Sequence, residues 1–297
     1  MDRPTLLKTL QLDSFIALDF ETTGLQPEVD RVIEVAAILF KNGEPIDRYT
    51  TLVNPGIPIP ELIEEITGIT NNMVADAPSE SSIIDEFFQF IGDIPIVAHN
   101  TPFDLAYLEA MANRHDKELP DRKYYDTLTL SRGMLFFQPA HNLSAVSDYF
   151  SLSTEGAHRA ESDTENCGQI FVELIEEASS YSLDLISRIV TLLKPFKVYN
   201  KELFINLANA LTQTGDLKNA LTESKIQKPT NINVFIHEGK KDISNRNSTE
   251  VFGPDGNLDQ SYEAYEDRPN QAYFSQFVDD ILTSPGGIGI AEAGTGL

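Results

Sequence analysis

The feature that most restricts the fold of this chain is a largely apolar, β-rich run, Val32–Lys41, that ends at Asn42-Gly43. An Asn-Gly pair between two apolar runs is a strong signal for a tight β-hairpin. We therefore expect a return strand at about Glu44–Val53. A shorter apolar run, Phe15–Phe20, precedes the hairpin. The chain is thus expected to begin with an antiparallel meander of three strands.

After the meander, the pattern changes to alternating helices and strands. Helices are expected near Glu61–Thr67, after Ala77-Pro78-Ser79 with Ile83, Ile84, Phe87, Phe88 and Ile91 on one face, near Pro102–Asn113 and from Asp163 to about Glu177. Strands are expected at Ile94–Ala98 and Lys123–Asp126. This alternation predicts an α/β fold.

The part of the chain beyond residue 180 is expected to be mostly helical and then to become a linker. Helical patterns cover Tyr181–Leu193 and Glu202–Leu211, and past Lys225 the sequence is polar and rich in turn residues. The stretch from Lys194 to Arg246 contains nine Lys or Arg residues and five Asp or Glu residues. We interpret this least acidic region as a solvated surface in preference to a phosphate-binding one.

The charge of the chain limits its partners less than it first suggests. A net charge of −24 argues against a phosphate-bearing partner. The acidity is concentrated in residues 1–180, which hold 31 acidic and 11 basic residues. Bound divalent cations would supply positive charge there, so a nuclease is not excluded.

The cysteine content and the N-terminal sequence indicate a cytoplasmic protein. The single cysteine, Cys167, cannot form an internal disulfide. The N-terminal sequence lacks the apolar core of a secretory leader, and no run of about 18 apolar residues occurs. These features argue against secretion and against insertion into a membrane.

An acidic pair ends the first apolar run. Asp19 and Glu21 are two residues apart, so in a strand both side chains point to one face while Phe20 points to the core. Two carboxylates about 4 Å apart repel by about 4 kcal/mol at an effective dielectric constant near 20. An isolated pair of this kind is most simply a solvent-facing strand edge, but here the hydroxyl-rich sequence Thr22-Thr23-Gly24-Leu25 follows.

Two further motifs follow in order. The sequence His99-Asn100-Thr101-Pro102-Phe103-Asp104 comes after a predicted buried strand and opens a helix, whose N-terminal dipole favours Asp104. The sequence His158-Arg159-Ala160-Glu161-Ser162-Asp163 opens a later helix.

Together the three motifs resemble those of the DEDDh 3′→5′ exonucleases, the DnaQ-like family that includes the proofreading subunit of bacterial DNA polymerase III. The resemblance spans about Phe15 to Glu177, and a histidine five residues before Asp163 defines the h subtype. A tyrosine four residues before that aspartate would mark the sister group, and that position is Arg159. The resemblance implies a ribonuclease H-like fold, with a mixed sheet flanked by helices. It also implies an enzyme that acts on single-stranded DNA or RNA 3′ ends, with DNA favoured.

The resemblance also implies roles for individual residues. Two Mg²⁺ or Mn²⁺ ions would be held by Asp19, Glu21, Asp104 and Asp163, with Asp19 bridging both ions and His158 acting as general base. The terminal nucleotide would contact Thr22, Thr23, Gly24 and Leu25, with Leu25 or Phe103 wedged against bases. Leu25 and Phe103 could equally be core residues. His99 and Asn100 are expected to shape the site rather than to catalyse.

A second resemblance lies at the C-terminus. Tyr265–Gln271 and Ala291–Leu297 resemble the start of a DinG-type superfamily 2 helicase, with Arg268, Gln271, Ala293, Gly294, Thr295 and Gly296 matching its nucleotide-binding motifs. The chain ends before the Gly-Lys-[Ser/Thr] that would complete the phosphate loop. We therefore expect ATP to bind only in a longer parent chain, an exonuclease–helicase fusion truncated here.

These interpretations predict three segments and leave two alternative functions. The segments are an exonuclease domain at residues 1–180, a helical segment and polar linker at 181–260, and a truncated helicase start at 261–297. The alternatives are a polymerase proofreading subunit and a non-catalytic module that binds 3′ ends. A lost carboxylate or histidine would favour the binding module, and none is lost.

Overall fold

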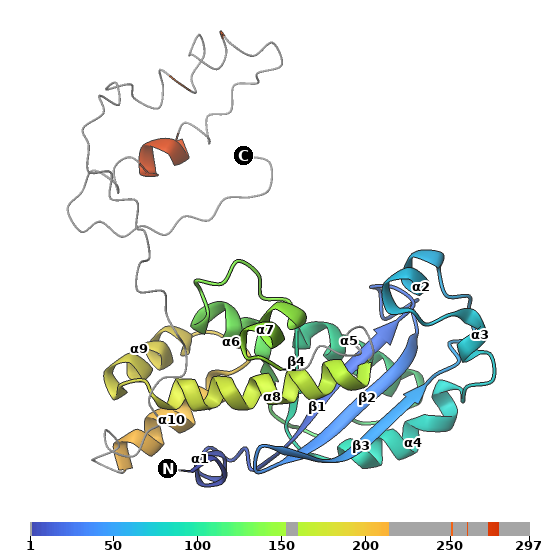
Figure 1. The fold of residues 1–297 in the computed structure, drawn as a ribbon, viewed down its shortest axis with the longest axis horizontal. Coiled ribbons are helices and arrows are strands. Elements are labelled where there is room, and N and C mark those ends of the chain that lie inside the picture. Colours follow the sequence, from blue (N-terminus) through green and yellow to red (C-terminus); the bar gives the residue numbers. More distant parts are fainter. Residues whose placement is uncertain (1, 153–159, 214–250, 252–259, 261–272, 279–297) are drawn as a thin grey trace. The chain divides into compact units, whose positions relative to one another are not determined.

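A computed structural model describes residues 2–152 and 160–213, together with residues 251, 260 and 273–278. The chain forms two units, Met1–Pro229 and Thr230–Leu297. In the second unit, the described residues 273–278 are helical. The elements with names all belong to the first unit (Figure 1).

A mixed five-stranded sheet forms the centre of the first unit. Its strands are β1 (Ser14–Thr22), β2 (Val32–Lys41), β3 (Glu44–Leu52), β4 (Ile96–Ala98) and β5 (Tyr124–Asp126), in the order β3-β2-β1-β4-β5. The strands β1, β2 and β3 pair antiparallel, whereas β4 and β5 run parallel to β1. The expected meander followed by an α/β half is confirmed.

The Asn-Gly hairpin is also confirmed. Asn42 has φ 54° and Gly43 has φ 89°, so both turn residues adopt positive φ angles, as a type I′ turn requires. Lys41 pairs with Glu44 directly across the turn. A Cβ atom on Gly43 would lie 2.7 Å from Cδ of Arg3, so the turn also needs glycine for space.

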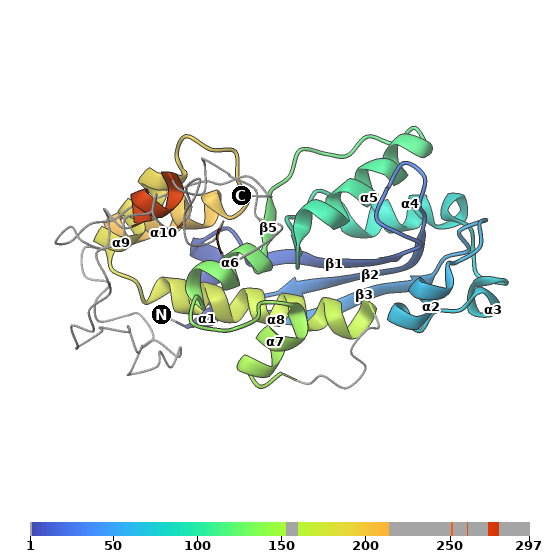
Figure 2. The ribbon, with the colours of Figure 1, turned by 90° about the horizontal axis from the view of Figure 1, so that it is seen from above.

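Ten helices surround the sheet in the described part of the chain. They are α1 (Arg3–Thr9), α2 (Glu61–Thr67), α3 (Asn71–Val74), α4 (Glu80–Ile91), α5 (Thr101–Arg114), α6 (Thr127–Met134), α7 (Leu143–Tyr149), α8 (Ala160–Ser179), α9 (Leu183–Leu193) and α10 (Lys201–Gln213). The helix α8 covers one face of the sheet, and α4 and α5 cover the other (Figure 2). The sequence did not predict α1, α3 or α7.

Most of the expected helix and strand boundaries agree with the observed ones to within one or two residues, and the differences have local causes. The strand β4 begins at Ile96 rather than Ile94. Pro95 has no N–H for the ladder, and its carbonyl accepts the N–H of Ile16 at 2.8 Å. The helix α9 begins after Ser182, whose hydroxyl accepts the N–H of Leu185 at 3.3 Å and caps the helix.

Alternate residues of β1 build two different cores. Phe15 and Ala17 lie in the apolar cluster under α8, whereas Ile16 and Phe20 lie in the cluster under α4 and α5. This period of two fixes which face each later residue of β1 occupies. The first cluster also contains buried residues of α9 and α10, namely Ile186, Leu203, Phe204, Leu207 and Leu211. These two helices therefore share a core with the sheet.

The structure also describes the single cysteine and the apolar character of the helices. Cys167 is a free, buried thiol in α8. Among the described residues, no helix combines the length and the apolar character that crossing a membrane would need.

Candidate active site

The acidic pair lies in the second half of β1. Phe20 is 3% exposed in the cluster under α4 and α5, so Asp19 and Glu21 share the opposite face, toward α8. Both acidic residues are partly buried. Their neighbours across the β2 ladder are Ala36 and Glu34, respectively.

Asp104 reaches the acidic pair from the first turn of α5. Its side chain is 3% exposed, and its Oδ1 accepts the main-chain N–H of Phe20 at 3.1 Å. The donor belongs to the residue between Asp19 and Glu21, so this bond fixes Asp104 beside both. The start of α5 is fixed in turn by Asn100, which has φ 80° and donates its N–H to Asp126 at 3.0 Å.

Asp163 lies in the first turn of α8, the helix that covers the acidic face of β1. That turn is held to the sheet by Thr164, whose Oγ1 donates to Ala36 O at 3.5 Å. His158, the expected general base, and Arg159 lie outside the described residues.

The four acids act on one another electrostatically. Burial, and then the charges of Asp104, Glu21, Asp163 and Glu34, raise the pKa of Asp19 well above its ordinary value. Burial, and then Asp163 and Glu34, raise the pKa of Glu21 to about 7. Burial also raises the pKa of Asp104 well above its ordinary value, although the N–H of Phe20 opposes the shift. The acids thus form one strongly repelling group.

The chemistry of this group fits divalent cations. Its donors are carboxylate oxygens, which Mg²⁺ and Mn²⁺ prefer, and a bound cation would relieve the repulsion that raises these pKa values. Within residues 2–152 and 160–213 no three Asp, Glu, His or Cys side chains are already arranged to hold an ion. The set of metal ligands therefore stays a prediction.

Glu34 is a fifth acid that sequence reasoning missed. It is 1% exposed, lies opposite Glu21 on β2, and its Oε2 accepts the N–H of Ala160 at 3.2 Å. Ala160 is the first residue of α8, so Glu34 fixes the start of the helix that carries Asp163. The available signal was a single carboxylate within the apolar run Val32–Phe40, where burial of an unpaired charge is costly.

The loop after β1 is held mainly by its own side chains. The hydroxyl of Thr22 donates to Gly24 O at 2.6 Å, and the phenol of Tyr107 donates to the same oxygen at 2.8 Å. The hydroxyl of Thr23 donates to Asp30 at 3.2 Å. A Cβ atom on Gly24 would lie 2.3 Å from Oδ2 of Asp30, so this glycine makes room for a neighbouring carboxylate.

The two candidate wedge residues differ in exposure. Leu25 is 80% exposed, so it is not a core residue. Phe103 packs on Tyr107, with ring centroids 5.1 Å apart, and joins the cluster under α4 and α5. Of the two candidates, Leu25 is therefore the one whose apolar side chain lies mostly in solvent.

His99 is fully hydrogen-bonded. Its Nδ1 lies 2.9 Å from the Thr127 hydroxyl and its Nε2 lies 2.9 Å from His141 O. Burial lowers the pKa of His99, although the bond to His141 O opposes the shift. Both ring nitrogens are engaged, which agrees with a role in shaping the site.

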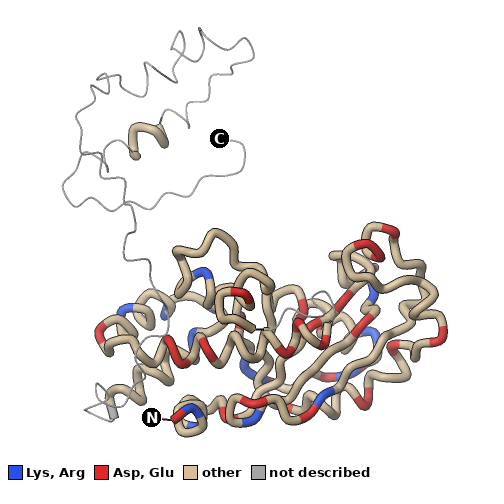
Figure 3. The backbone as a smooth tube through the Cα atoms, viewed as in Figure 1, with Lys and Arg blue, Asp and Glu red and all other residues tan. Residues whose placement is uncertain are grey.

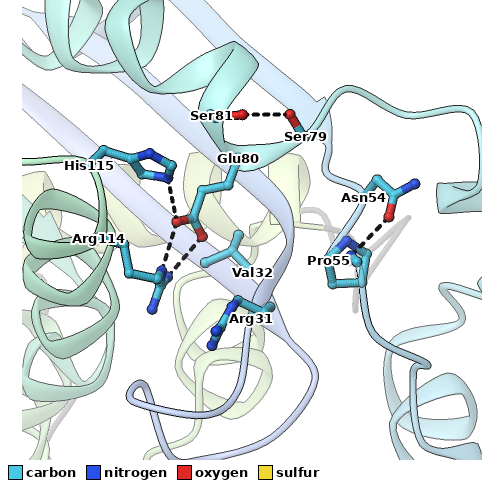
Figure 4. A pocket seen from close by; sticks show the side chains of 10 residues that line it. Arg31, Val32, Asn54, Pro55, Ser79, Glu80, Ser81, Arg114 and His115 are labelled. Atoms are coloured by element: carbon cyan, nitrogen blue, oxygen red, sulfur yellow. Dashed lines mark hydrogen bonds and ion pairs between the residues drawn. The ribbon is translucent and has the colours of Figure 1, made fainter.

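A cavity of about 370 Å³ lies beyond the acidic pair, near the start of β2 (Figure 4). Arg114 at the end of α5 forms a bidentate ion pair with Glu80 at the start of α4, with both N···O distances 2.8 Å. Arg114 also donates to Pro27 O at 2.9 Å, and His115 contacts Glu80 at 2.9 Å. This cluster joins two helices to the loop after β1. Asn54 and Pro55 line the same cavity.

The predicted nucleotide-binding residues of the C-terminal segment are not part of this geometry. Arg268, Gln271, Ala293, Gly294, Thr295 and Gly296 all lie outside the described residues.

Comparison with known proteins shows the family of the chain. The model of the family described as "Exonuclease" matches residues 16–171, more than half of the chain. The chain is 29% identical over 287 residues to "3'-5' exonuclease DinG" of Bacillus subtilis, covering 93% of this chain and 30% of that protein. It is 34% identical over 206 residues to "DNA polymerase III PolC-type" of Thermotoga maritima, covering 65% of this chain and 15% of that protein. The chain thus spans less than a third of the length of either relative.

Solved structures extend the likeness to the fold. The zinc-bound complex of Escherichia coli exonuclease I with single-stranded DNA matches with a TM-score of 0.54 and 18% identity, over 63% of this chain and 46% of that chain. At this identity the likeness concerns the fold alone. It agrees with a mixed sheet flanked by helices.

Proposed function

This chain belongs to the exonuclease family, in its DEDDh form and with a ribonuclease H-like fold, and from this premise we propose that it removes nucleotides from the 3′ ends of single-stranded nucleic acid, with DNA favoured. The proposal rests above all on the group of mutually repelling acids on β1 and α5. After burial, Asp104 and Glu21 raise the pKa of Asp19, and Asp163 raises that of Glu21, although nothing in a stable fold requires these acids to meet.

The acids have a function if cations complete them. Asp19, Glu21, Asp104 and Asp163 would hold two Mg²⁺ or Mn²⁺ ions, whose charge attracts a phosphodiester to an acidic surface and stabilises charge in an in-line displacement. Exonucleases of the DEDDh type are metal-dependent, and we propose Mg²⁺ or Mn²⁺ as the ions and these four acids as their ligands.

The residues of the chain would then position the substrate and move the proton. Leu25, exposed beside the acidic pair, would lie against the terminal base. The loop Thr22–Leu25 would offer main-chain groups, since its hydroxyls are engaged internally. His158 would accept the proton of the attacking water, and Glu34 would fix the helix start that follows His158.

The larger context is also a proposal. The match to the exonuclease DinG extends over 93% of this chain, whereas the match to the polymerase from Thermotoga maritima covers 65%. This difference supports a DinG-type parent over a polymerase proofreading subunit. The nucleotide-binding resemblance at Tyr265–Gln271 and Ala291–Leu297 would contribute to ATP binding only in a longer chain.

The proposal can be tested with single strands labelled at the 3′ or the 5′ end. With Mg²⁺, a 3′ label should be released at once as a mononucleotide, while a 5′ label should remain on progressively shorter strands. EDTA and Asp19→Asn should both stop the reaction. The matched control is Asp47→Asn, which removes an exposed acid from β3. Cleavage that survives EDTA or Asp19→Asn contradicts the proposal, and tight 3′-end binding without product favours the non-catalytic alternative.

A further inference from the structure

A pocket of basic residues lies at the free edge of the sheet, beyond β5. The cavity, about 560 Å³, is lined by Arg122, Lys123 and Tyr124 and by residues 197–202, which form the end of the α9–α10 loop and the start of α10 and include Lys197, Tyr199 and Lys201. We name it the edge pocket. Its two segments are more than 70 residues apart in the sequence, so the fold alone brings the cations together.

The charge of the edge pocket is opposite to that of the chain as a whole. Four cationic side chains line it together with one acid, Glu202, whereas the chain holds 46 acidic and 22 basic residues. Acidic positions also outnumber basic ones along the described chain in Figure 3. In the described part of the chain only Lys123 among the four forms an ion pair, with Glu202 at 3.6 Å. The remaining positive charge is available to an anion.

The edge pocket is preformed rather than a chance gathering of surface lysines. Asn200 is 4% exposed. Its side-chain Oδ1 accepts the N–H of Asp126 at 2.9 Å and its Nδ2 donates to Asp126 O at 2.9 Å, so the amide pairs with β5 as the main chain of a sixth strand would. Lys201, the first residue of α10, donates its ammonium group to the carbonyls of Lys194 and Phe196 in the preceding loop. These bonds hold the loop against β5 before any ligand arrives, which reduces the entropy cost of binding.

The guanidinium of Arg122 is only partly satisfied. It donates to the carbonyls of Ile91 and Gly92, but its buried Nε has no hydrogen-bond partner among the described residues. Two partly exposed tyrosines, Tyr124 and Tyr199, lie among the cations. Cations interleaved with aromatic rings are the pattern by which proteins hold single-stranded nucleic acid without reading its sequence.

The edge pocket is within reach of the acidic group. In the parallel register Asp126 is level with Ala98, and Val97, the residue before Ala98, is level with Ala17, two residues before Asp19. Asn200, bound to Asp126, is therefore three strand spacings, or about 15 Å, from Asp19 across the sheet. A short single strand spans that distance, whereas a dinucleotide with its 3′ end at Asp19 does not reach the pocket.

We propose that the edge pocket binds the phosphates of single-stranded nucleic acid on the 5′ side of the nucleotide being removed. Lys197 and Lys123 would contact phosphates, and Tyr124 and Tyr199 would stack on bases. This inference rests on the proposed function, because the acids must hold the 3′ end of the same strand. It assigns the least acidic part of the sequence a phosphate contact, the interpretation that the sequence alone did not favour.

The test compares two substrates in the whole 297-residue chain. Lys197→Glu reverses an exposed charge in the edge pocket, and Arg188→Glu makes the same change on the neighbouring helix α9, outside it. With Mg²⁺, we expect Lys197→Glu to raise KM for a long single strand roughly fivefold, with kcat unchanged and the dinucleotide KM unchanged. Arg188→Glu should leave all three values unchanged.

Binding measured in EDTA with a fluorescent long strand gives a second readout. Loss of one phosphate contact should reduce the slope of log affinity against log salt by about 0.7. An equal effect of the two variants, or no change in the long-strand KM, overturns the inference while cleavage of both substrates upholds the proposed function. If the unsubstituted chain cleaves neither substrate, the proposed function fails first.

Discussion

Two partly buried glutamates at the same end of the sheet have opposite electrostatic surroundings. Burial alone would raise the pKa of Glu80, but the hydrogen bonds and charge of Arg114, and then those of His115, lower it below its ordinary value. Burial, and then the charges of Asp163 and Glu34, together raise the pKa of Glu21 to about 7. One glutamate has its countercharge within the chain. The other lies among like charges, as a site for an external cation requires.

This difference separates a carboxylate that stabilises the fold from carboxylates that destabilise it. Glu80 links α4 and α5 through a bidentate ion pair, so its charge is part of the stability of that corner. Asp19, Glu21 and Asp104 cost stability until a cation binds. The two regions should therefore respond in opposite directions to the removal of one acid.

The largest expected effect is on catalysis at the acidic group. Asp19→Asn should reduce kcat/KM about 10³-fold, or about 4 kcal/mol, because the acid thought to bridge both ions is lost. In the absence of metal, the same variant should unfold at an equal or higher temperature, since one repelling charge is gone. Kinetics and thermal unfolding in EDTA measure both quantities. A variant that loses activity and also stability would mean that Asp19 is structural.

Metal should stabilise only a chain with an intact acidic group. At a free Mg²⁺ or Mn²⁺ concentration about 100 times Kd, a single bound ion raises the free energy of unfolding by about 2.7 kcal/mol. We expect this rise in the unsubstituted chain and in Glu80→Gln, and its loss in Asp19→Asn. Equal stabilisation of all three would place the ion elsewhere and remove the distinction between the two glutamates.

Glu80→Gln should show the opposite behaviour. Losing the carboxylate leaves Arg114, whose side chain is 22% exposed, without its partner, and we expect a loss of about 2 kcal/mol in the free energy of unfolding. The value of kcat should stay within a factor of about two. Glu86→Gln, an exposed acid on the same helix, is the matched control. Chemical denaturation of the three proteins measures the difference, and an equal loss in the control would contradict it.

The contrast between these regions shows how far the sequence determined the fold. Local signals were sufficient for the meander: the apolar run Val32–Lys41 and the Asn-Gly turn were placed as the structure has them. They were sufficient because turn chemistry and the period of two depend on adjacent residues. The helix α1 has a local signal too, because the side chain of Asp2 accepts the N–H of Thr5 and caps the helix.

Features that depend on residues far apart in the sequence were missed. Glu34 acquires its role only when α8 docks 126 residues later. Gly24 leaves room for the carboxylate of Asp30, which lies beside it in the folded loop. The edge pocket forms from segments that no window of sequence joins. The candidate acids could be predicted because three motifs far apart in the sequence occur together, and their joint occurrence carries long-range information.

A smaller effect is expected at Glu34, which combines both behaviours: it adds charge to the acidic group and holds the start of α8. Glu34→Gln keeps an oxygen for the N–H of Ala160 and should retain activity within a few-fold, whereas Glu34→Ala should lose about tenfold in kcat/KM, or about 1.4 kcal/mol. The reason is that Asp163 follows that turn. Comparing the two variants at matched metal saturation separates the anchor from the charge. Equal losses would mean that the charge of Glu34 matters and the anchor does not.

The smallest effect is a pH dependence that differs between the two regions. The pKa of Glu80 is lowered in the folded chain, so its ion pair stabilises the fold above the ordinary glutamate pKa, and this stability is lost as pH falls through the lower folded pKa. The difference in unfolding free energy between the unsubstituted chain and Glu80→Gln should therefore be constant from about pH 7 to 5 and shrink by about 1 kcal/mol toward pH 3. At the acidic group the pKa values are raised, so in EDTA the advantage of Asp19→Asn should instead disappear as pH falls and protonation relieves the repulsion. The free energy of unfolding of the unsubstituted chain minus that of the variant should thus fall with falling pH for Glu80→Gln and rise for Asp19→Asn. A change in the same direction for both variants would mean that Glu80 and the acidic group do not differ, because only opposite shifts in pKa give opposite signs.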